Sequence, residues 1–210
     1  MNTDKKQALS VHLKAIRRML IVSVASVAVL FVLFFYLLCG PLVDFVLAPV
    51  RARGIEVITT SVSEALMMQF KVCLIAAVIA GMPVIIWQVW VFVAPALYPQ
   101  EKRLFAALFF VALLLFVGGV AFCYCLVFPM AIDLFWSAAD GVASTLWSVK
   151  EYFNFVLSFV LPFGLMFELP VVVYMLARRG LVTYQKLAHS RKYVILVIAI
   201  IAAILTPPDA

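Results

Sequence analysis

Long uncharged apolar runs are the feature that most constrains this chain. One extends from Met19 to Gly40 and another from Leu104 to Ile132, and neither contains an acidic or basic residue. As a helix rising about 1.5 Å per residue, either run is long enough to cross a hydrocarbon layer of roughly 30 Å. The runs are continuous rather than alternating, which favours helices over a barrel. The chain is therefore predicted to be an all-α, polytopic membrane protein.

The composition supports this prediction and excludes other classes. Hydrophobic residues make up 67% of the chain and charged residues 12%. An ordinary soluble domain has about 45 to 50% apolar residues and about 25% charged residues. The net charge of +6 arises from bases beside the ends of apolar runs, so topology explains it and no nucleic-acid partner is expected. The four cysteines lie within or beside apolar runs and form no Cys-x-x-Cys pair, so they are interpreted as packing residues. No metal and no cofactor are expected.

The apolar runs predict five spans within a single domain that covers residues 1–210. A cleaved signal peptide is disfavoured, because its apolar region would have only about 7 to 15 residues. The polar intervals Pro41–Ser63 and Asp133–Glu151 are predicted to be external loops, and Pro49 lies in the first of them. The last run is short for an unperturbed bilayer. The predicted spans are residues 19–40, 63–93, 104–131, 152–177 and 193–205.

The distribution of charge predicts the orientation. Most Lys and Arg residues lie before the first run, around Lys102 and Arg103, and between residues 178 and 192. Most acids lie in the other polar intervals. Because cytoplasmic segments carry the excess of bases, the N-terminus is predicted to be cytoplasmic.

The sequence offers no enzyme site. It contains no Gly-x-x-x-x-Gly-Lys-Ser/Thr phosphate-binding motif. Neither histidine has a nucleophile and an acid placed where they could form a catalytic triad with it. The prediction is a protein without catalytic residues.

Glu168 is the acid that lies deepest within an apolar run. It precedes Arg178 by about 15 Å of helix, which places it near the middle of the membrane. A charged side chain there costs at least about 2.5 to 3.5 kcal/mol. Either Glu168 is protonated or hydrogen-bonded in a structural role, or it serves a transport pathway or a partner helix.

Glu101 follows an aromatic segment with two prolines, at the point where the chain is predicted to leave the membrane. Pro95 and Pro99 interrupt helical hydrogen bonding, and Lys102 and Arg103 follow the acid. As a solvated surface acid it would contribute only about 0 to 1 kcal/mol to an ion pair. Where the membrane surface excludes water, its carboxylate can instead hold an arginine guanidinium in a bidentate fork that lysine does not fit.

Four stretches, in this order along the chain, resemble the TatC family, the multispanning component of the twin-arginine protein translocase. The first extends from Gln88 to Arg103 and contains QVW, Phe92, APALY and, around Glu101, QEKR. The others are FCYCLVFP from Phe122 to Pro129, FELP from Phe167 to Pro170, and TPPD from Thr206 to Asp209. The resemblance covers nearly the whole chain.

This resemblance implies a function and a set of site residues. The protein would be a receptor and core subunit that binds twin-arginine signal peptides and helps export folded proteins across the bacterial inner membrane with the proton motive force. Glu101 would contact the signal, with Phe92 and Leu97 near the same groove and Arg17 and Arg103 in the same set.

The resemblance also implies partners and further positions. TatB and TatA would be protein partners within an oligomer surrounded by membrane lipids. Glu168 would contact the single-span partners, and Pro49 and Asp209 would belong to external segments. A sixth helix would follow TPPD, so the chain is expected to lack the last helix of the family.

The N-terminal segment departs from the family pattern. His12, Leu13 and Arg17 match His-Leu-x-Glu-Leu-Arg, but Ala15 stands where an acid is expected. The protein would therefore bind the signal more weakly or use another group. Two other readings remain open, a truncated inactive relative and a proton- or ion-coupled small-solute transporter that uses Glu168, although no inverted repeat supports the latter.

Overall fold

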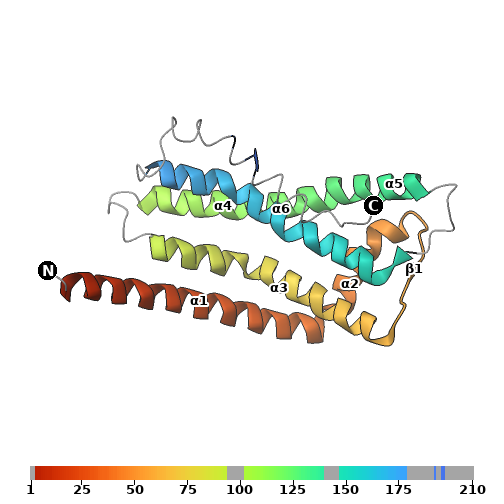
Figure 1. Cartoon of the computed structure of the whole chain (residues 1–210), viewed down its shortest axis with the longest axis horizontal. Coiled ribbons are helices and arrows are strands. Elements are labelled where there is room, and N and C mark those ends of the chain that lie inside the picture. The colour runs from red at the N-terminus through yellow and green to blue at the C-terminus, as the bar shows by residue number, and fades with distance from the viewer. Residues whose placement is uncertain (1–2, 94–101, 140–146, 179–191, 193–194, 197–210) are drawn as a thin grey trace.

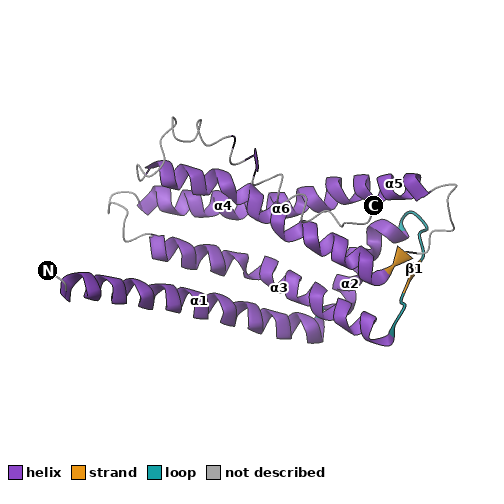
Figure 2. Ribbon diagram, viewed as in Figure 1, coloured by secondary structure: helices purple, strands orange, loops and turns teal. Residues whose placement is uncertain are grey.

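The computed structural model describes residues 3–93, 102–139, 147–178, 192 and 195–196 (Figure 1). Within these residues, four helices are long and apolar enough to span a membrane. The prediction of an all-α membrane protein is confirmed, and Figure 2 shows that the described chain is almost entirely helical. Nearly all of the predicted run at 193–205 lies outside the described residues.

The long helices lie side by side in a bundle, and shorter elements cover one end of it (Figure 1). The end with the first residues of α1 and α4 and the last residues of α3 and α6 is called the N-terminal end here. The opposite end, which carries α2 and β1, is called the capped end (Figure 1). The elements are α1 (Thr3–Leu37), α2 (Cys39–Arg51), β1 (Val57–Ile58), α3 (Val62–Val93), α4 (Lys102–Phe122), the π-helix η3 (Cys123–Val127), α5 (Phe128–Ala139), β2 (Trp147–Ser148) and α6 (Val149–Arg178).

The first predicted external segment contains a helix, because residues from Cys39 to Arg51 form α2. This helix is short and amphipathic. It buries Leu47 and Val50, while Asp44 and Arg51 form an exposed ion pair of 2.7 Å. An apolar stripe that can be buried against neighbouring helices stabilises a helix despite its polar residues.

Pro49 lies inside α2 and shapes the packing of that helix. Proline has no N–H, so it cannot donate to the carbonyl oxygen of Phe45, four residues earlier. That oxygen instead accepts a 2.8 Å hydrogen bond from the hydroxyl of Tyr124. The next carbonyl, of Val46, accepts a 2.8 Å bond from the Tyr152 hydroxyl. The proline therefore frees an acceptor that ties α2 to η3, and a second tyrosine ties it to α6.

The second predicted external loop was placed too early, because α5 continues to Ala139 and Asp133 is helical. The charge of Asp133 is paired with Arg53, so it does not require an end to the helix here. The π-helix η3 lies just before Pro129, and the N–H of Phe128 donates to Cys123 across the π-turn. Proline cannot supply a helical N–H, and a π-turn beside it lets the axis continue. A span of 32 residues, Ala106–Ser137, results.

Two clusters of buried side chains hold the helices together. The first lies among α2, α3, η3, α5 and α6, and it includes the fully buried Val50, Phe128 and Ile132. The second joins α3, α4 and α6 through residues such as Trp90 and Phe116. The apolar window of α1 is not buried, so α1 lies at the edge of the bundle along α3. Many large apolar side chains remain exposed, as expected where lipid replaces water.

Helices α4 and α6 approach closely at two glycines. A Cβ atom on Gly119 would lie 2.8 Å from the carbonyl oxygen of Phe163 and 2.9 Å from the ring of Phe167. A Cβ atom on Gly164 would lie 2.6 Å from the ring of Phe116. Small residues at such positions allow the close backbone contact on which helix packing in membranes depends.

Candidate functional site

The N-terminal end of the bundle brings together the segments that contain the predicted signal-binding residues. Helix α3 ends at Val93 and α4 begins at Lys102, both at this end of the bundle (Figure 1). Phe92 lies in the last turn of α3 and Arg103 in the first turn of α4. Leu97 and Glu101 are part of the connection and lie outside the described residues.

The packing of α1 on α3 sets the level of Arg17. The two helices are antiparallel, and a Cβ atom on Gly81 would lie 3.3 Å from Val27 and 3.5 Å from Leu30. Both helices rise by about 1.5 Å per residue. The stretch from Gly81 to Val93 therefore has the same length as the stretch from Val27 back to Ala15. Arg17 is thus level with the end of α3, close to where the connection to α4 starts.

Arg17 and Ala15 are both exposed on this part of α1. The missing acid at Ala15 therefore leaves no carboxylate on the exposed turn that contains Arg17. Any carboxylate that binds a basic ligand at this level has to come from another segment. Glu101, at the end of the α3–α4 connection, is the acid that the sequence places nearest to this level.

Glu168 lies in the half of α6 that is closer to the N-terminal end. The side chain is half-buried, and its Oε1 atom is buried without a hydrogen-bond partner among the described residues. The preceding residue, Phe167, packs on Phe122 of α4 at a ring distance of 5.7 Å. Val171, one turn later, belongs to the cluster shared with α3 and α4. A buried carboxyl oxygen without a partner is costly, and such groups mark functional positions in membrane proteins.

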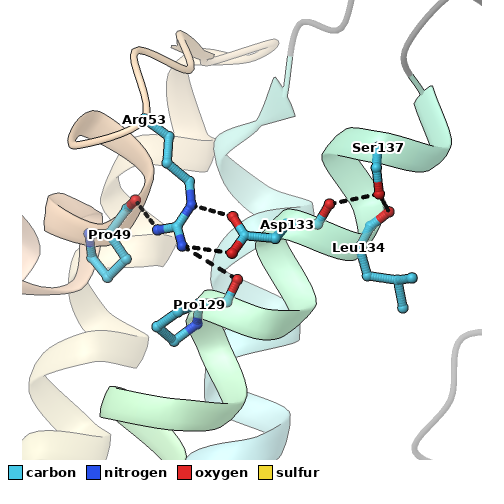
Figure 3. Close-up of polar contacts among 6 residues, drawn as sticks. All are labelled: Pro49, Arg53, Pro129, Asp133, Leu134 and Ser137. Atoms are coloured by element: carbon cyan, nitrogen blue, oxygen red, sulfur yellow. Dashed lines mark hydrogen bonds and ion pairs between the residues drawn. The ribbon is translucent and has the colours of Figure 1, made fainter.

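The capped end contains an ion pair that the sequence analysis missed (Figure 3). Arg53 donates from Nε and Nη2 to the two carboxylate oxygens of Asp133, at 2.5 and 3.0 Å. It also donates from Nη1 to the carbonyl of Pro49 at 3.0 Å and from Nη2 to that of Pro129 at 3.4 Å. The hydrogen bonds to Asp133 raise the pKa of Arg53. This guanidinium therefore joins the end of α2 to α5.

Glu64 was missed as a second structural centre of the capped end. Its Oε2 accepts from the N–H and hydroxyl of Thr60, at 2.8 and 2.6 Å, and from the N–H of Ser61 at 3.2 Å. Its Oε1 accepts from the hydroxyl of Ser148 at 3.0 Å and from the N–H of Lys150 at 2.9 Å. One buried carboxylate therefore serves the first turns of both α3 and α6. The signal that could have revealed half of this role is Ser61-x-x-Glu64 before an apolar run, which is the capping-box pattern.

The remaining predicted positions lie elsewhere. Pro49 is inside α2, as described above, and Asp209 lies outside the described residues. Among the residues that the structure describes, no group of three or more His, Cys, Asp and Glu side chains could hold a metal ion.

The fold and these positions can be compared with known proteins. A family model described as "Sec-independent protein translocase protein (TatC)" matches residues 11–210. The chain belongs to the TatC family. A TatC protein of Carboxydothermus hydrogenoformans is 37% identical over 98% of this chain and 85% of its own length. One of Haemophilus influenzae is 34% identical over 99% of this chain and 82% of its own length.

Solved TatC structures agree with this assignment. The crystal structure described as "Twin Arginine Translocase Receptor- TatC" is 36% identical to this chain and superposes with a TM-score of 0.86. The match covers 93% of this chain and 87% of the other. A second TatC crystal structure, obtained in the detergent DDM, gives the same TM-score at 35% identity. The resemblance to the TatC family is therefore confirmed, and the chain is a transport component with several membrane helices.

Proposed function

We propose that this chain is the membrane receptor and core subunit of a twin-arginine translocase. In this role it binds twin-arginine signal peptides at the N-terminal end of the bundle and helps move folded proteins across the bacterial inner membrane. The observation that carries the proposal is the match, along 93% of the chain, to a twin-arginine translocase receptor. The proton motive force supplies the energy, in keeping with a sequence that has no nucleotide-binding motif.

The orientation follows from the charges. Arg17, Arg18, Arg103 and Arg178 all belong to helix segments toward the N-terminal end of the bundle. The positive-inside rule assigns that end to the cytoplasm, where signal peptides are first met.

Signal recognition is assigned to Glu101. The two guanidinium groups of the signal need acceptors, and a carboxylate that accepts two parallel N–H bonds distinguishes arginine from lysine. Because Ala15 supplies no acid at the level of Arg17, Glu101 carries this role without help from that position. Phe92, in the last turn of α3, and Leu97, within the connection, supply apolar contacts for the residues around the arginine pair.

Site-specific photocross-linking tests this assignment. A photoreactive residue at Phe92 or Leu97 should cross-link to a signal peptide that carries Arg-Arg. The yield should fall at least about tenfold with Lys-Lys or with Glu101→Gln, which corresponds to one lost charge-assisted interaction. Glu56→Gln is the matched control, because it removes an exposed carboxylate at the capped end. An unchanged cross-link yield with the Lys-Lys signal and with Glu101→Gln would instead indicate a relative that keeps the TatC fold but does not recognise twin-arginine signals.

The partner contact is assigned to Glu168. Its unpartnered Oε1 atom needs a donor, and a helix of TatB or TatA that supplies a polar group within the membrane would provide one. Glu168→Ala should reduce co-purification of these partners and export of a folded reporter, while Glu168→Gln, which keeps hydrogen-bonding capacity, should retain more of both. Unchanged export in well-folded Glu168→Ala protein would remove this assignment.

A further inference from the structure

A cavity of about 240 Å³ opens between α3 and α6 at the capped end. Its lining combines two cations, Lys71 and Lys150, with the apolar side chains of Met67 and Phe153 and the amide of Asn154. It lies far from the proposed signal-binding connection, which is at the other end of α3 (Figure 1). Neither the ion pair of Arg53 nor the family comparison accounts for these lysines.

The two lysines have spare capacity for an anion. Lys71 donates from Nζ to the side-chain oxygen of Asn154 at 2.8 Å, and an ammonium group has three donors. Within the described part of the chain, neither Lys71 nor Lys150 forms a salt bridge. Both lysines therefore line one cavity, and neither is ion-paired with a carboxylate among the described residues.

Glu64 also lines the cavity and keeps its negative charge, so the lining carries one net positive charge. Its two oxygens already accept five hydrogen bonds from Thr60, Ser61, Ser148 and the N–H of Lys150. A carboxylate offers about four lone-pair positions, so its accepting capacity is used.

The position in the membrane adds a requirement. Lys71 follows Glu64 by about 10 Å along α3, one turn beyond Met67, which is 62% exposed. A cation at this depth lies near the boundary between headgroups and hydrocarbon, the level at which lysine side chains meet lipid phosphates. The ligand that fits has an anionic group for the lysines and an apolar chain for the exposed Met67.

We propose that this cavity binds the phosphate of an anionic phospholipid. The phosphate oxygens accept hydrogen bonds from Lys71 and Lys150, and the acyl chains follow the exposed apolar surface of α3 past Met67. Ammonium groups form charge-assisted hydrogen bonds with phosphate oxygens, and the exposed apolar surface beside them suits the acyl chains. The lipid would bridge α3 and α6, the same two helices that Glu64 joins through their first turns.

The test uses the purified full chain in a neutral detergent and follows its melting temperature. Dihexanoyl phosphatidylglycerol is the probe. Phosphatidylcholine of the same chain length and inorganic phosphate at equal concentration are the comparison arms. The expected result is stabilisation by phosphatidylglycerol alone. In the Lys71→Gln/Lys150→Gln protein, the midpoint of the titration should rise at least about tenfold, because two charge-assisted contacts are lost.

Two further variants keep the proposal falsifiable. Lys14→Gln/Arg18→Gln removes the same charge from an exposed part of α1 toward the other end and should leave the titration unchanged. Lys71→Arg/Lys150→Arg keeps the cations and should bind, which separates loss of charge from misfolding. Equal stabilisation by phosphatidylcholine, or the same midpoint in the glutamine variant, would overturn the proposal. Full stabilisation by phosphate alone would show an anion site without a lipid and would also overturn it.

Discussion

Replacing Gly119 with alanine should force α4 and α6 apart. The added Cβ would lie 2.8 Å from the carbonyl oxygen of Phe163 and 2.9 Å from the ring of Phe167. Non-bonded carbon atoms rest about 3.5 to 4.0 Å apart, so the helices have to separate by roughly 0.5 Å or more. The nearest obstacle is backbone, which cannot rotate away as the end of a side chain can.

The expected cost follows from two opposing effects. Overpacking a well-packed contact costs about 1 to 3 kcal/mol. Alanine in place of glycine within a helix contributes about 0.8 to 1.0 kcal/mol in the other direction. The free energy of unfolding should therefore fall by about 0 to 2 kcal/mol in Gly119→Ala.

Gly118 provides a control one residue away. A Cβ atom at Gly118 would meet no atom within 4 Å. Gly118→Ala therefore keeps the gain in helix propensity without the clash. The two alanine proteins should differ by about 1 to 3 kcal/mol, which corresponds to about 2 to 12 °C in melting temperature for a chain of this size.

The assay is a thermal melt of both proteins in the same detergent, followed by intrinsic fluorescence. The Gly118→Ala protein should melt at or above the wild type, and the Gly119→Ala protein below it. Equal melting temperatures for the two variants would refute the close approach of α4 and α6 at Gly119.

Two further changes test the capped end. Glu64→Gln should lower the melting temperature by several degrees relative to Glu56→Gln, because an amide nitrogen cannot accept the bonds that one carboxylate oxygen now accepts; equal melts would contradict the shared capping role. Arg53→Lys should speed proteolytic cleavage between α2 and α3, because lysine cannot reproduce the bidentate contact with Asp133. Cleavage at the wild-type rate, in a digest sampled over time, would show that a single charge is sufficient there.

The long helices could be predicted because hydrocarbon imposes a simple rule on sequence. A span was predicted at residues 63–93, where Glu64 and Lys71 are the only charged residues, and α3 extends from Val62 to Val93. Glu168 also drew attention from sequence alone, because an acid inside such a run breaks the rule. The structure adds that its Oε1 atom is buried without a described partner.

The capped end could not be predicted, because its order depends on contacts between distant segments. α2 contains two prolines and two charged residues, and it is helical because Tyr124, Tyr152 and the buried core hold it. The partner of Arg53 lies 80 residues away in sequence. For the proposed signal-binding site at the N-terminal end, the residue types could be predicted from the sequence. The level of Arg17 could not, because it depends on the packing of α1 on α3.

The shared carboxylate of Glu64 has a consequence for biosynthesis. Thr60 and Ser61 are made with Glu64, but Ser148 follows it by 84 residues. While the ribosome is still adding α4 and α5, the Oε1 atom of Glu64 has no protein donor and is hydrated by water. The first turn of α3 therefore has to remain at the membrane surface. The emergence of Ser148 and Lys150 then supplies the donors for the second carboxylate oxygen. A late contact of this kind makes insertion of α6 the event that commits the bundle to its final form.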